Sequence, residues 1–420
     1  MAEMKDSGTA WLGMIPKDWE LSKISSIYEL RTQKVSDKDY PPLSVTMNGI
    51  VPQLDSAAKT NAHDDRKLVK KGDFAINSRS DRRGSCGVSE YDGSVSLINT
   101  VIKPRDEMNP DYYNWLFHTI QFADEFYKWG HGIVDDLWTT NWQDMKHIDI
   151  PVPTLDEQKV IADYLNKAIP EIDALHTDIE KQIETLEEYK KSIITEAVTK
   201  GLDPDVEMKD SGIELIGQIP NEWKISRLGW ISKKIGDGIH GTVTFEDGET
   251  NFYFINGNNI KKRNIAIKDN TQRITERIYN TYKTNLTTHT ILISLNGTIG
   301  NLAFYNNENV LLGKSVGFIE LKEEYNREYI YYLLQANYIK TIFELSFAGT
   351  TINNLSLQTL RKTNVLLPPK TEQKKIVKYL DKKCAEIDGA IEEKKEQLDT
   401  LEQYKKSVIY EYVTGKKEVQ

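Results

Sequence analysis

Cysteine is almost absent from this sequence: Cys86 and Cys384 are the only two in 420 residues. Two distant cysteines fit a reducing compartment and argue against a disulfide framework or a cysteine-rich zinc site. No run of about 18 apolar residues occurs, so no membrane span is expected. The N-terminal stretch from Met1 to Asp6 lacks the apolar segment of a signal peptide. These absences predict a cytoplasmic protein.

Catalytic motifs are missing as well. The sequence contains neither H-E-x-x-H nor G-x-S-x-G, and its histidines form no ligand pair at helical spacing. It also lacks the motif of asparagine or aspartate followed by Pro-Pro-aromatic, which holds a flipped base in amino-methyltransferases. A sequence without such constellations favours a binding or scaffold protein, with no cofactor or metal of its own.

Two partial phosphate-binding motifs are weak. Residues 236–241 (GDGIHG) match G-x-G-x-x-G, but β-branched residues follow them where that motif should open a helix. Gly313-Lys314-Ser315 resembles the end of a P-loop, yet Glu308 stands where the first glycine should be. We interpret the first as a glycine-rich loop and the second as a strand–turn segment in which Lys314 is a candidate phosphate contact.

Positive charge is also in short supply. The chain has 54 Lys and Arg against 63 Asp and Glu, a net charge of −9 that by itself argues against a DNA-binding protein. The distribution is uneven: residues 154–200 carry roughly −5, residues 21–150 roughly −3 and residues 225–365 roughly +4. The acidity is therefore densest in the segment 154–200.

What the sequence does contain is an internal duplication. Glu157-Gln158-Lys159 recurs as Glu372-Gln373-Lys374, and Tyr189–Ser192 recurs as Tyr404–Ser407, both 215 residues later. Upstream, the segment from Met4 to Trp19 recurs from Met208 to Trp223, 204 residues later. This period is too long for a solenoid repeat of about 20–50 residues. A whole module with its following helix has been duplicated, and the module interiors have diverged.

The repeated segments predict two long helices. Ile172, Ile179, Leu186 and Ile193 recur at seven-residue spacing, with Leu175 and Tyr189 in d-like positions. Pro170 is expected to interrupt the first helix, and Gly201 and Pro204 to end it. The second helix has a poorer register. The residues predicted to pack the helices together are Ile172, Ile179, Leu186, Ile193, Ile387, Leu398, Leu401 and Val408.

Between the helices lie two inserts with short β-like runs and turn signals. Residues 74–77, 95–98, 252–255 and 290–294 are predicted strands, and residues 112–129 and 329–347 are predicted helices. The predicted fold is α+β, with β-rich domains at 1–153 and 208–368 and helical regions at 154–207 and 369–420. The two long helices pack as an antiparallel coiled coil, which relates the inserts by a pseudo-two-fold axis and places them at opposite ends.

Polar loops in the inserts are the remaining candidates for a binding site. Residues 78–84 (SRSDRRG) place three arginines on one loop, which can bind phosphates or guanine edges. A solvated turn with local pairs to Asp81 explains them equally well. The corresponding loop of the second insert, residues 294–300, has no arginine. A second matched pair, residues 131–136 and 349–354, follows the predicted helices, and capping chemistry is its alternative explanation.

The frame of two inserts and two repeated helices resembles the specificity (S) subunit of type I restriction-modification systems. The resemblance covers the whole chain. It rests on the segment from Ser211 to Lys224 with its variant from Ser7 to Glu20, on the helix starts P-x-x-x-E-Q-K-x-I at Pro153 and Pro368, and on the helix ends EYKKSII and QYKKSVI. These motifs are specific together and weak singly.

The resemblance implies that each insert is a target recognition domain that binds one half of a bipartite DNA site. It implies that the helices set the spacer and dock two methyltransferase (M) subunits, joined by restriction/translocase (R) subunits. S-adenosylmethionine, ATP and Mg are then expected in those partners, for adenine-N6 methylation and DNA cleavage. The net negative first insert departs from expectation, so isolated binding should be weak and strongly salt-dependent.

The residues predicted to contact DNA are polar or basic and lie on the loops of both inserts: Ser78, Arg79, Ser80, Arg82, Arg83, His131, Asn256, Asn258, Lys261, Lys262, Arg263, Asn296, Thr298, Lys314, Thr350, Thr351 and Asn353. Three other hypotheses stay open at this point. The chain could be a fused enzyme whose catalytic part is not apparent, a coiled-coil adaptor whose inserts bind protein, or a silent copy without partners.

Overall fold

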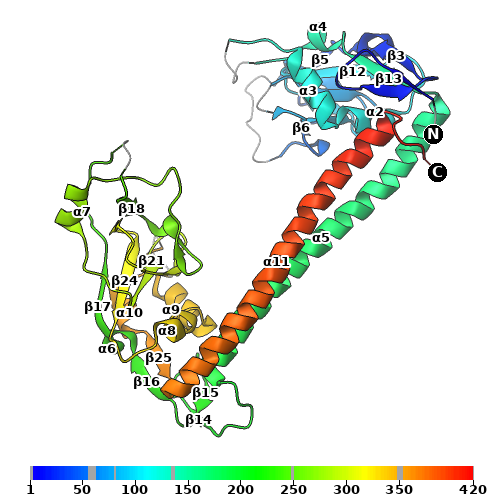
Figure 1. The fold of residues 1–420 in the computed structure, drawn as a ribbon. Helices are drawn as coiled ribbons and strands as arrows, with labels where there is room; N and C mark the ends of the chain where they lie inside the picture. Colours follow the sequence, from blue (N-terminus) through cyan, green and yellow to red (C-terminus); the bar gives the residue numbers. More distant parts are fainter. Residues whose placement is uncertain are drawn as a thin grey trace. The chain divides into compact units, whose positions relative to one another are not determined.

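A computed structural model describes residues 3–54, 63–79, 82–133, 138–246, 250–347 and 353–419 (Figure 1). The internal contacts divide the chain into two units. Unit 1 comprises Met1–Glu180 with Lys395–Gln420, and unit 2 comprises Lys181–Lys394. Each unit therefore combines one insert with part of each long helix, and the helical regions 154–207 and 369–420 are each shared between units.

The main sheet of unit 1 is antiparallel, with strand order β4–β12–β9–β10. Its strands are β4 (Tyr28–Leu30), β9 (Phe74–Asn77), β10 (Cys86–Val88) and β12 (Asn99–Pro104). The other strands of the unit are β1 (Met4–Asp6), β2 (Met14–Pro16), β3 (Glu20–Lys23), β5 (Lys34–Val35), β6 (Leu43–Thr46), β7 (Gly49–Pro52), β8 (Arg66–Val69), β11 (Gly93–Val95) and β13 (Asp149–Val152).

The main sheet of unit 2 repeats this topology in order β17–β24–β21–β22, again antiparallel. Its strands are β17 (Ser232–Asp237), β21 (Thr290–Ser294), β22 (Leu302–Phe304) and β24 (Val316–Leu321). In both sheets the first strand pairs with the last. The remaining strands are β14 (Met208–Asp210), β15 (Gln218–Pro220), β16 (Lys224–Arg227), β18 (Tyr253–Ile255), β19 (Ile260–Lys261), β20 (Asn264–Ile265), β23 (Val310–Leu312) and β25 (Asn364–Leu367).

Most of the predicted strands are present. Residues 74–77 and 290–294 form β9 and β21, and residues 253–255 form β18. The strand predicted over 95–98 is wrong, because β11 ends at Val95 and Leu97 is exposed. The three apolar residues of that segment do not all face one core, so hydrophobicity alone overestimated the strand.

Each insert helix predicted as one piece is two. In unit 1 α2 (Pro110–Phe117) is followed by α3 (Ile120–Lys128), with the Thr119 hydroxyl capping α3 by accepting from Phe122 N at 3.2 Å. In unit 2 α8 (Arg327–Leu333) is followed by α9 (Asn337–Phe347). The break is invisible in the apolar pattern because both pieces face the same core. The other short helices are α1 (Ile24–Ile27), α4 (Trp142–Met145), α6 (Leu228–Ile231), η3 (Gly257–Asn259), α7 (Glu276–Tyr282) and α10 (Leu357–Lys362).

The two long helices are α5 (Leu155–Lys200) and α11 (Lys370–Val413). Pro170 lies inside α5, so the predicted interruption is wrong. A proline removes one backbone hydrogen bond from a helix interior. Here Ile169 and Leu165 beside it are buried in the core of unit 1, and that packing holds the helix continuous.

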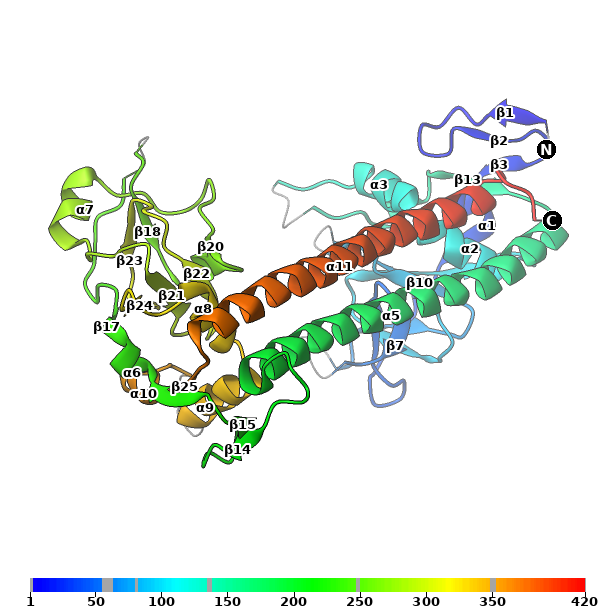
Figure 2. The ribbon, with the colours of Figure 1, turned by 60° about the horizontal axis from the view of Figure 1, so that its bottom comes forward.

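Within each unit α5 and α11 run antiparallel, side by side in both ribbon views (Figures 1 and 2). In unit 1 Asp173 pairs with Lys405, with 2.5 Å between carboxylate oxygen and ammonium nitrogen. In unit 2 Lys190 pairs with Asp388, also at 2.5 Å. Residues 173 and 190 correspond to 388 and 405 at the offset of 215, so these are two copies of one contact. The predicted antiparallel pair and internal repeat are confirmed.

The predicted packing residues of the helices are buried or half-buried. Ile179, Ile193, Ile387 and Val408 are buried, and Ile172, Leu186, Leu398 and Leu401 are half-buried. Leu175 and Tyr189 are instead 49% and 55% exposed, so their assignment to the d-like positions is wrong. The second buried position of each heptad instead lies four residues after the first: His176 and Ile183 are half-buried, and Ile183 packs against the core of unit 2.

A repeated joint attaches each insert to the helix that follows it. Trp19 Nε1 donates to Glu157 at 3.0 Å in unit 1, and Trp223 Nε1 donates to Glu372 at 3.0 Å in unit 2. Both indoles are buried. The next residue of each motif, Gln158 or Gln373, is also buried and donates to the carbonyl oxygen of the proline five residues earlier. These bonds explain why I-P-x-x-W and E-Q are repeated together.

The two glutamates of this joint differ in electrostatics. The pKa of Glu157 is lowered because its hydrogen bonds from Thr154 and Trp19 outweigh burial, and Thr154 offers both its N–H (2.8 Å) and its hydroxyl (2.7 Å). Pro369 stands at the position of Thr154 and has neither donor. The pKa of Glu372 is therefore raised, first by burial, with the charge of Glu222 acting in the same direction.

We expect the variants Glu157→Gln and Glu372→Gln to behave differently at pH 7. A lowered pKa means that charged Glu157 stabilises unit 1 above its unfolded pKa, and this contribution is lost as the pH falls through the folded pKa. A raised pKa means that the charge on Glu372 costs stability above its folded pKa. Glu157→Gln should lower the unfolding free energy by about 1 kcal/mol or less, and Glu372→Gln should not lower it.

Urea unfolding followed by circular dichroism at pH 7 and pH 4 checks this. The difference between the two variants should shrink at pH 4, where Glu372 of the parent protein, whose pKa is raised, takes up a proton and its charge no longer costs stability. Equal destabilisation by both variants at pH 7 would contradict the assigned asymmetry.

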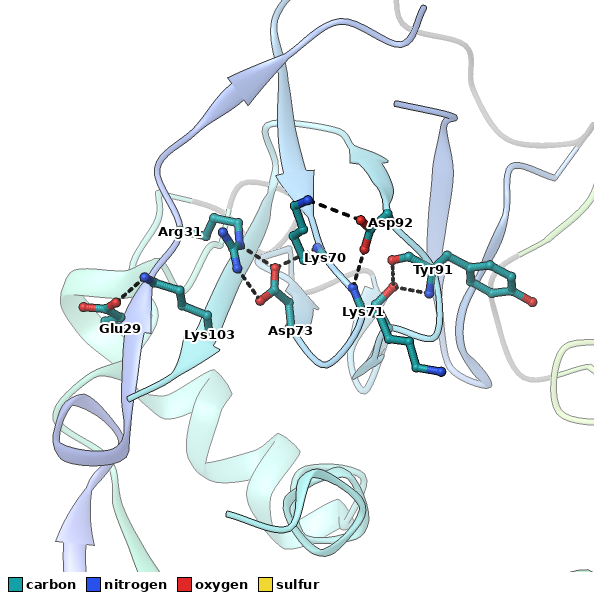
Figure 3. Close-up of polar contacts among 9 residues, drawn as sticks. Glu29, Arg31, Lys70, Lys71, Asp73, Tyr91, Asp92 and Lys103 are labelled. Atoms are coloured by element: carbon teal, nitrogen blue, oxygen red, sulfur yellow. Dashed lines mark hydrogen bonds and ion pairs between the residues drawn. The ribbon is translucent and has the colours of Figure 1, made fainter. Parts of the chain in front are cut away.

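An ionic network holds the turn before β9 in unit 1 (Figure 3). Arg31 binds Asp73 through two hydrogen bonds of 2.5 and 2.8 Å, and the Lys70 backbone N–H donates to the same carboxylate at 2.8 Å. Asp73 is buried and fully paired, which is the condition for tolerating a buried charge. Lys103 pairs with Glu29 nearby. Arg31 and Lys103 therefore form ion pairs within unit 1.

Candidate functional site

The two candidate loop segments of unit 1 lie together at the end of β9. Thr140 N donates to Ser78 O at 2.9 Å, and Arg79 and His131 each form an isolated β-bridge with Thr139. Ser78 is buried and shares a hydrogen bond with Thr100, so its side chain belongs to the core. Arg79 and His131 are exposed. We refer to the described residues of these two segments, 78–79 and 82–83 with 131–133 and 138–140, as loop pair 1.

Helix α3 positions one arginine of loop pair 1. The Arg83 guanidinium forms an ion pair with Asp124 and lies 5.1 Å from the centroid of the Tyr127 ring. His131 lies 3.5 Å from Asp144. The predicted alternative, in which the arginines pair with Asp81, involves a residue outside the described ranges, as does the predicted contact Ser80. Loop pair 1 therefore presents exposed polar side chains, of which Arg83 and His131 contact acids of the same unit.

Unit 2 repeats the arrangement. Leu355 N donates to Leu295 O at 2.7 Å, and Asn296 and Asn354 form an isolated bridge. Gly297 and Gly300 adopt φ of +69° and +85°, which lets the loop turn tightly beyond β21. Thr298 and Asn353 are exposed, whereas the predicted contacts Thr350 and Thr351 lie outside the described ranges. We refer to residues 295–300 with 353–355 as loop pair 2.

Corresponding positions of the two loop pairs hold different side chains. Arg79 and Asn296 each follow the last inward residue of a central strand, and each bridges the segment after the second insert helix. Guanidinium forks suit guanine O6 and N7, whereas amides suit adenine N6 and N7. One scaffold thus offers different hydrogen-bonding groups at the same place in its two copies.

The third predicted segment, residues 256–263, divides into two parts. Asn256 is used internally: its side chain accepts from Ser315 Oγ at 3.0 Å and caps η3. Asn258, Lys261, Lys262 and Lys314 are exposed. Their contacts with DNA, and those of the other site residues, stay predictions. Residues 313–315 form the turn between β23 and β24, as predicted for that segment.

Arg263 faces helix α11 instead of solvent. Its guanidinium binds Asp381 at 2.6 Å and lies 5.0–5.6 Å from the rings of Phe304, Tyr331 and Tyr332. Lys262 and Arg263 form the two-residue turn between β19 and β20 with φ of +38° and +72°. Positive φ is unfavourable for long side chains, so the contacts of Arg263 with α11 hold a strained turn in place.

Sequence reasoning missed two cations beside this turn, Lys191 of α5 and Lys340 of α9. Lys191 belongs to the repeated Tyr-Lys-Lys-Ser motif, which was the available signal. Lys340 lies in the diverged interior of the second insert, where nothing in the sequence distinguishes it from a surface lysine.

The glycine-rich segment 236–241 does not have the strand-to-helix setting of a dinucleotide-binding loop in the described residues around it. β17 continues through Gly236, where a β-carbon would meet the Phe318 ring, and no helix opens after it. Across the ranges that the structure describes, no three His, Cys, Asp or Glu side chains are grouped to hold a metal ion. Within the same ranges, none of the helices combines the length and apolar character needed to cross a membrane.

The fold and loops define a duplicated recognition module assembled on an antiparallel helix pair. The chain belongs to the family of the type I restriction modification DNA specificity domain, whose model matches residues 16–185 and 220–403. Its function is DNA sequence recognition as a type I specificity subunit, which confirms the resemblance noted in the sequence.

Relatives agree over nearly the whole chain. The type I restriction enzyme MjaVIII specificity subunit of Methanocaldococcus jannaschii is 25% identical over 96% of this chain and 93% of its own length. A chain solved in work on complex assembly and conformational transition of the type I R-M system has a TM-score of 0.70 at 14% identity, covering 96% of this chain and 99% of its own. The HsdS subunit from Thermoanaerobacter tengcongensis has a TM-score of 0.51 at 16% identity, covering 96% and 98%. These structural matches concern the fold.

Proposed function

We propose that each unit binds one half of a bipartite DNA site through its loop pair. The observation that supports this most strongly is the presence of Arg79 and Asn296 at corresponding places in the two units. Different groups on one scaffold suit two different half-sites. In this proposal β9 and β21 hold the loops rigidly, and the exposed side chains beyond them contact base edges and phosphates.

The helix pair, in this proposal, sets the number of base pairs between the half-sites and docks methyltransferase subunits. Tyr189 and Tyr404 occur at corresponding positions of the two helices, and both are exposed. Such a repeated aromatic residue suits attachment of two copies of one partner. In this proposal the reacting groups belong to the partner subunits. S-adenosylmethionine for adenine methylation belongs to the methyltransferase subunits, and ATP with Mg to the restriction/translocase subunits, all in the cytoplasm.

Exchange of one insert tests the assignment of half-sites. Residues 224–367 would be replaced by the corresponding segment of a relative that recognises another site, and methylated adenines would be mapped after co-expression with the methyltransferase subunit. The expected result is a new second half-site with an unchanged first half-site. A change in both, or in neither, would contradict one unit binding one half-site.

Removal of two arginines tests loop pair 1. Arg82→Ala combined with Arg83→Ala removes exposed cations next to Arg79 and should weaken binding of duplex DNA at least tenfold, since each phosphate or base contact is worth about 1–3 kcal/mol. Fluorescence anisotropy measures the affinity. Asp124→Ala, which releases Arg83 from its ion pair, is a control that keeps both cations. Unchanged affinity and unchanged half-site preference in the double variant would remove this loop from the interface.

A further inference from the structure

A cleft in unit 2 lies between helices α5, α9 and α11 and the strained turn at Lys262. It has a volume of about 400 Å³ and is lined by five cationic side chains. These are Lys190, Lys191, Lys262, Arg263 and Lys340. Glu187, Asp381 and Asp388 also line it, so the formal charge of the lining is +2 (five cations minus three anions).

The acids of the cleft are mostly used by other cations. Asp381 binds Arg263 at 2.6 Å and accepts from the Tyr332 hydroxyl at 2.7 Å. Asp388 binds Lys190 at 2.5 Å and lies 3.9 Å from Lys262. Glu187 lies one helical turn before Lys191 on α5. The cleft therefore holds positive charge with which these acids form no ion pair.

That charge belongs to Lys191 and Lys340. Among the described residues neither ammonium group has an ion pair, although both line the cleft. The pKa of Lys340 is lowered first by desolvation and then by the positive charge of Lys191, while Glu344 acts in the opposite direction. Two ammonium groups that line one cleft and repel one another form a site that suits an anion.

A second cleft connects this site with loop pair 2. It has a volume of about 600 Å³ and shares Lys262, Tyr331, Gln335 and Lys340 with the first cleft. It is also lined by Gly297, Gly300 and Asn353 of loop pair 2. An anion bound between Lys191 and Lys340 would therefore belong to the same ligand that contacts loop pair 2.

Unit 1 lacks the corresponding site. Lys406 corresponds to Lys191, but it is bound to Glu402 at 2.5 Å. Ala123 of α3 corresponds to Lys340 of α9 when the two insert helices are aligned on their capping residues, Asn109 and Asn326. The duplication therefore offers a matched comparison, with an unpaired lysine pair in one unit and none in the other.

We propose that Lys191 and Lys340 bind one phosphate group of the DNA backbone beside the second half-site. Lys262 lies along the same stretch of backbone. This rests on the proposed DNA recognition by unit 2. Because this contact involves no base, it does not alter the recognised sequence. It positions the duplex on unit 2 and adds affinity. Through this lysine pair, unit 2 has a contact with the DNA backbone that unit 1 lacks.

The experiment compares Lys191→Gln/Lys340→Gln with Lys406→Gln in the full chain purified with its co-expressed methyltransferase subunit. Fluorescence anisotropy gives the binding constant for one duplex that carries the mapped site and another that lacks it, over a series of NaCl concentrations. The double variant should reduce the slope of log K against log [NaCl] by about 0.9, the value for one lost phosphate contact. It should lower the binding affinity for both duplexes equally. Lys406→Gln should leave the slope unchanged.

Each other outcome has a distinct meaning. An unchanged slope in the double variant, with parent-like DNA binding and the same mapped half-sites, overturns the phosphate site and leaves the recognition function intact. Absence of DNA binding by the parent complex would instead overturn the recognition function. Loss of the methyltransferase subunit from the double variant would show that the cleft binds an acidic segment of that protein, which also overturns the proposal. Circular dichroism confirms folding of each variant, and Lys340→Gln alone serves if the double variant does not fold.

Discussion

Trp223→Ala is expected to lower the unfolding free energy of unit 2 by about 3–5 kcal/mol, the range for removing a large buried aromatic side chain. Trp223 is 1% exposed and belongs to the core that includes Ile193, Ala197 and Ile376 from the two long helices. Its loss also leaves Glu372 without its indole donor in a half-buried position where the pKa is already raised. The joint between insert and helix would lose both packing and its hydrogen bond.

Two matched variants separate these contributions. Trp223→Phe keeps most of the packing and loses the hydrogen bond, so it should cost about 1–2 kcal/mol. Trp230→Ala removes a tryptophan of the same unit that is 63% exposed, and it should change the free energy by no more than about 0.5 kcal/mol. Urea unfolding followed by circular dichroism measures all three. Similar losses for Trp223→Ala and Trp230→Ala would refute a structural joint at Trp223.

Ile179→Asp is expected to destabilise the helix pair by about 3 kcal/mol or more, because it removes a buried apolar side chain and places a charge in its position. Ile179 is 6% exposed, on the face of α5 that is turned away from solvent. Thermal unfolding monitored by helical circular dichroism would show the loss as a lower midpoint.

Leu175→Asp is the control for that prediction. Leu175 lies one helical turn before Ile179 and is 49% exposed. Its substitution by aspartate introduces the same charge as Ile179→Asp. Its substitution should change stability by about 0.5 kcal/mol or less. If the two variants lowered the unfolding midpoint equally, the buried face of α5 would be wrongly assigned.

The frame of the molecule could be predicted from the sequence because it was present twice. The Trp19–Glu157 and Trp223–Glu372 joints and the Asp173–Lys405 and Lys190–Asp388 pairs all use residues of the repeated motifs. The repeats identify residues that are important for the fold, but they do not show which of these residues contact one another. The pairing of tryptophan with glutamate across 138 and 149 positions required the structure.

The errors in the helices have local causes. Leu175 lies three residues after Ile172, but the second buried position of each heptad lies four residues after the first, as Ile183 does after Ile179. Pro170 is tolerated because tertiary packing exceeds the loss of one backbone hydrogen bond. The break at Thr119 is a single capping residue inside an otherwise continuous apolar pattern.

The sequence predicted the loops of the candidate site, but it did not predict which loops lie together. Residues 78–83 and 131–136 stood out by composition, and only the sheet topology brings Arg79 and His131 to Thr139. Arg263 looked like a phosphate ligand because it follows two lysines. Its position over three aromatic rings depends on a turn with positive φ, which no propensity favours for arginine.

The most direct test of recognition by two different units is a map of methylated adenines in DNA from cells that co-express this chain with its methyltransferase subunit. We predict one motif made of two unlike half-sites separated by a constant number of unread base pairs. A single continuous motif, or methylation whose spacer varies from site to site, would contradict the account.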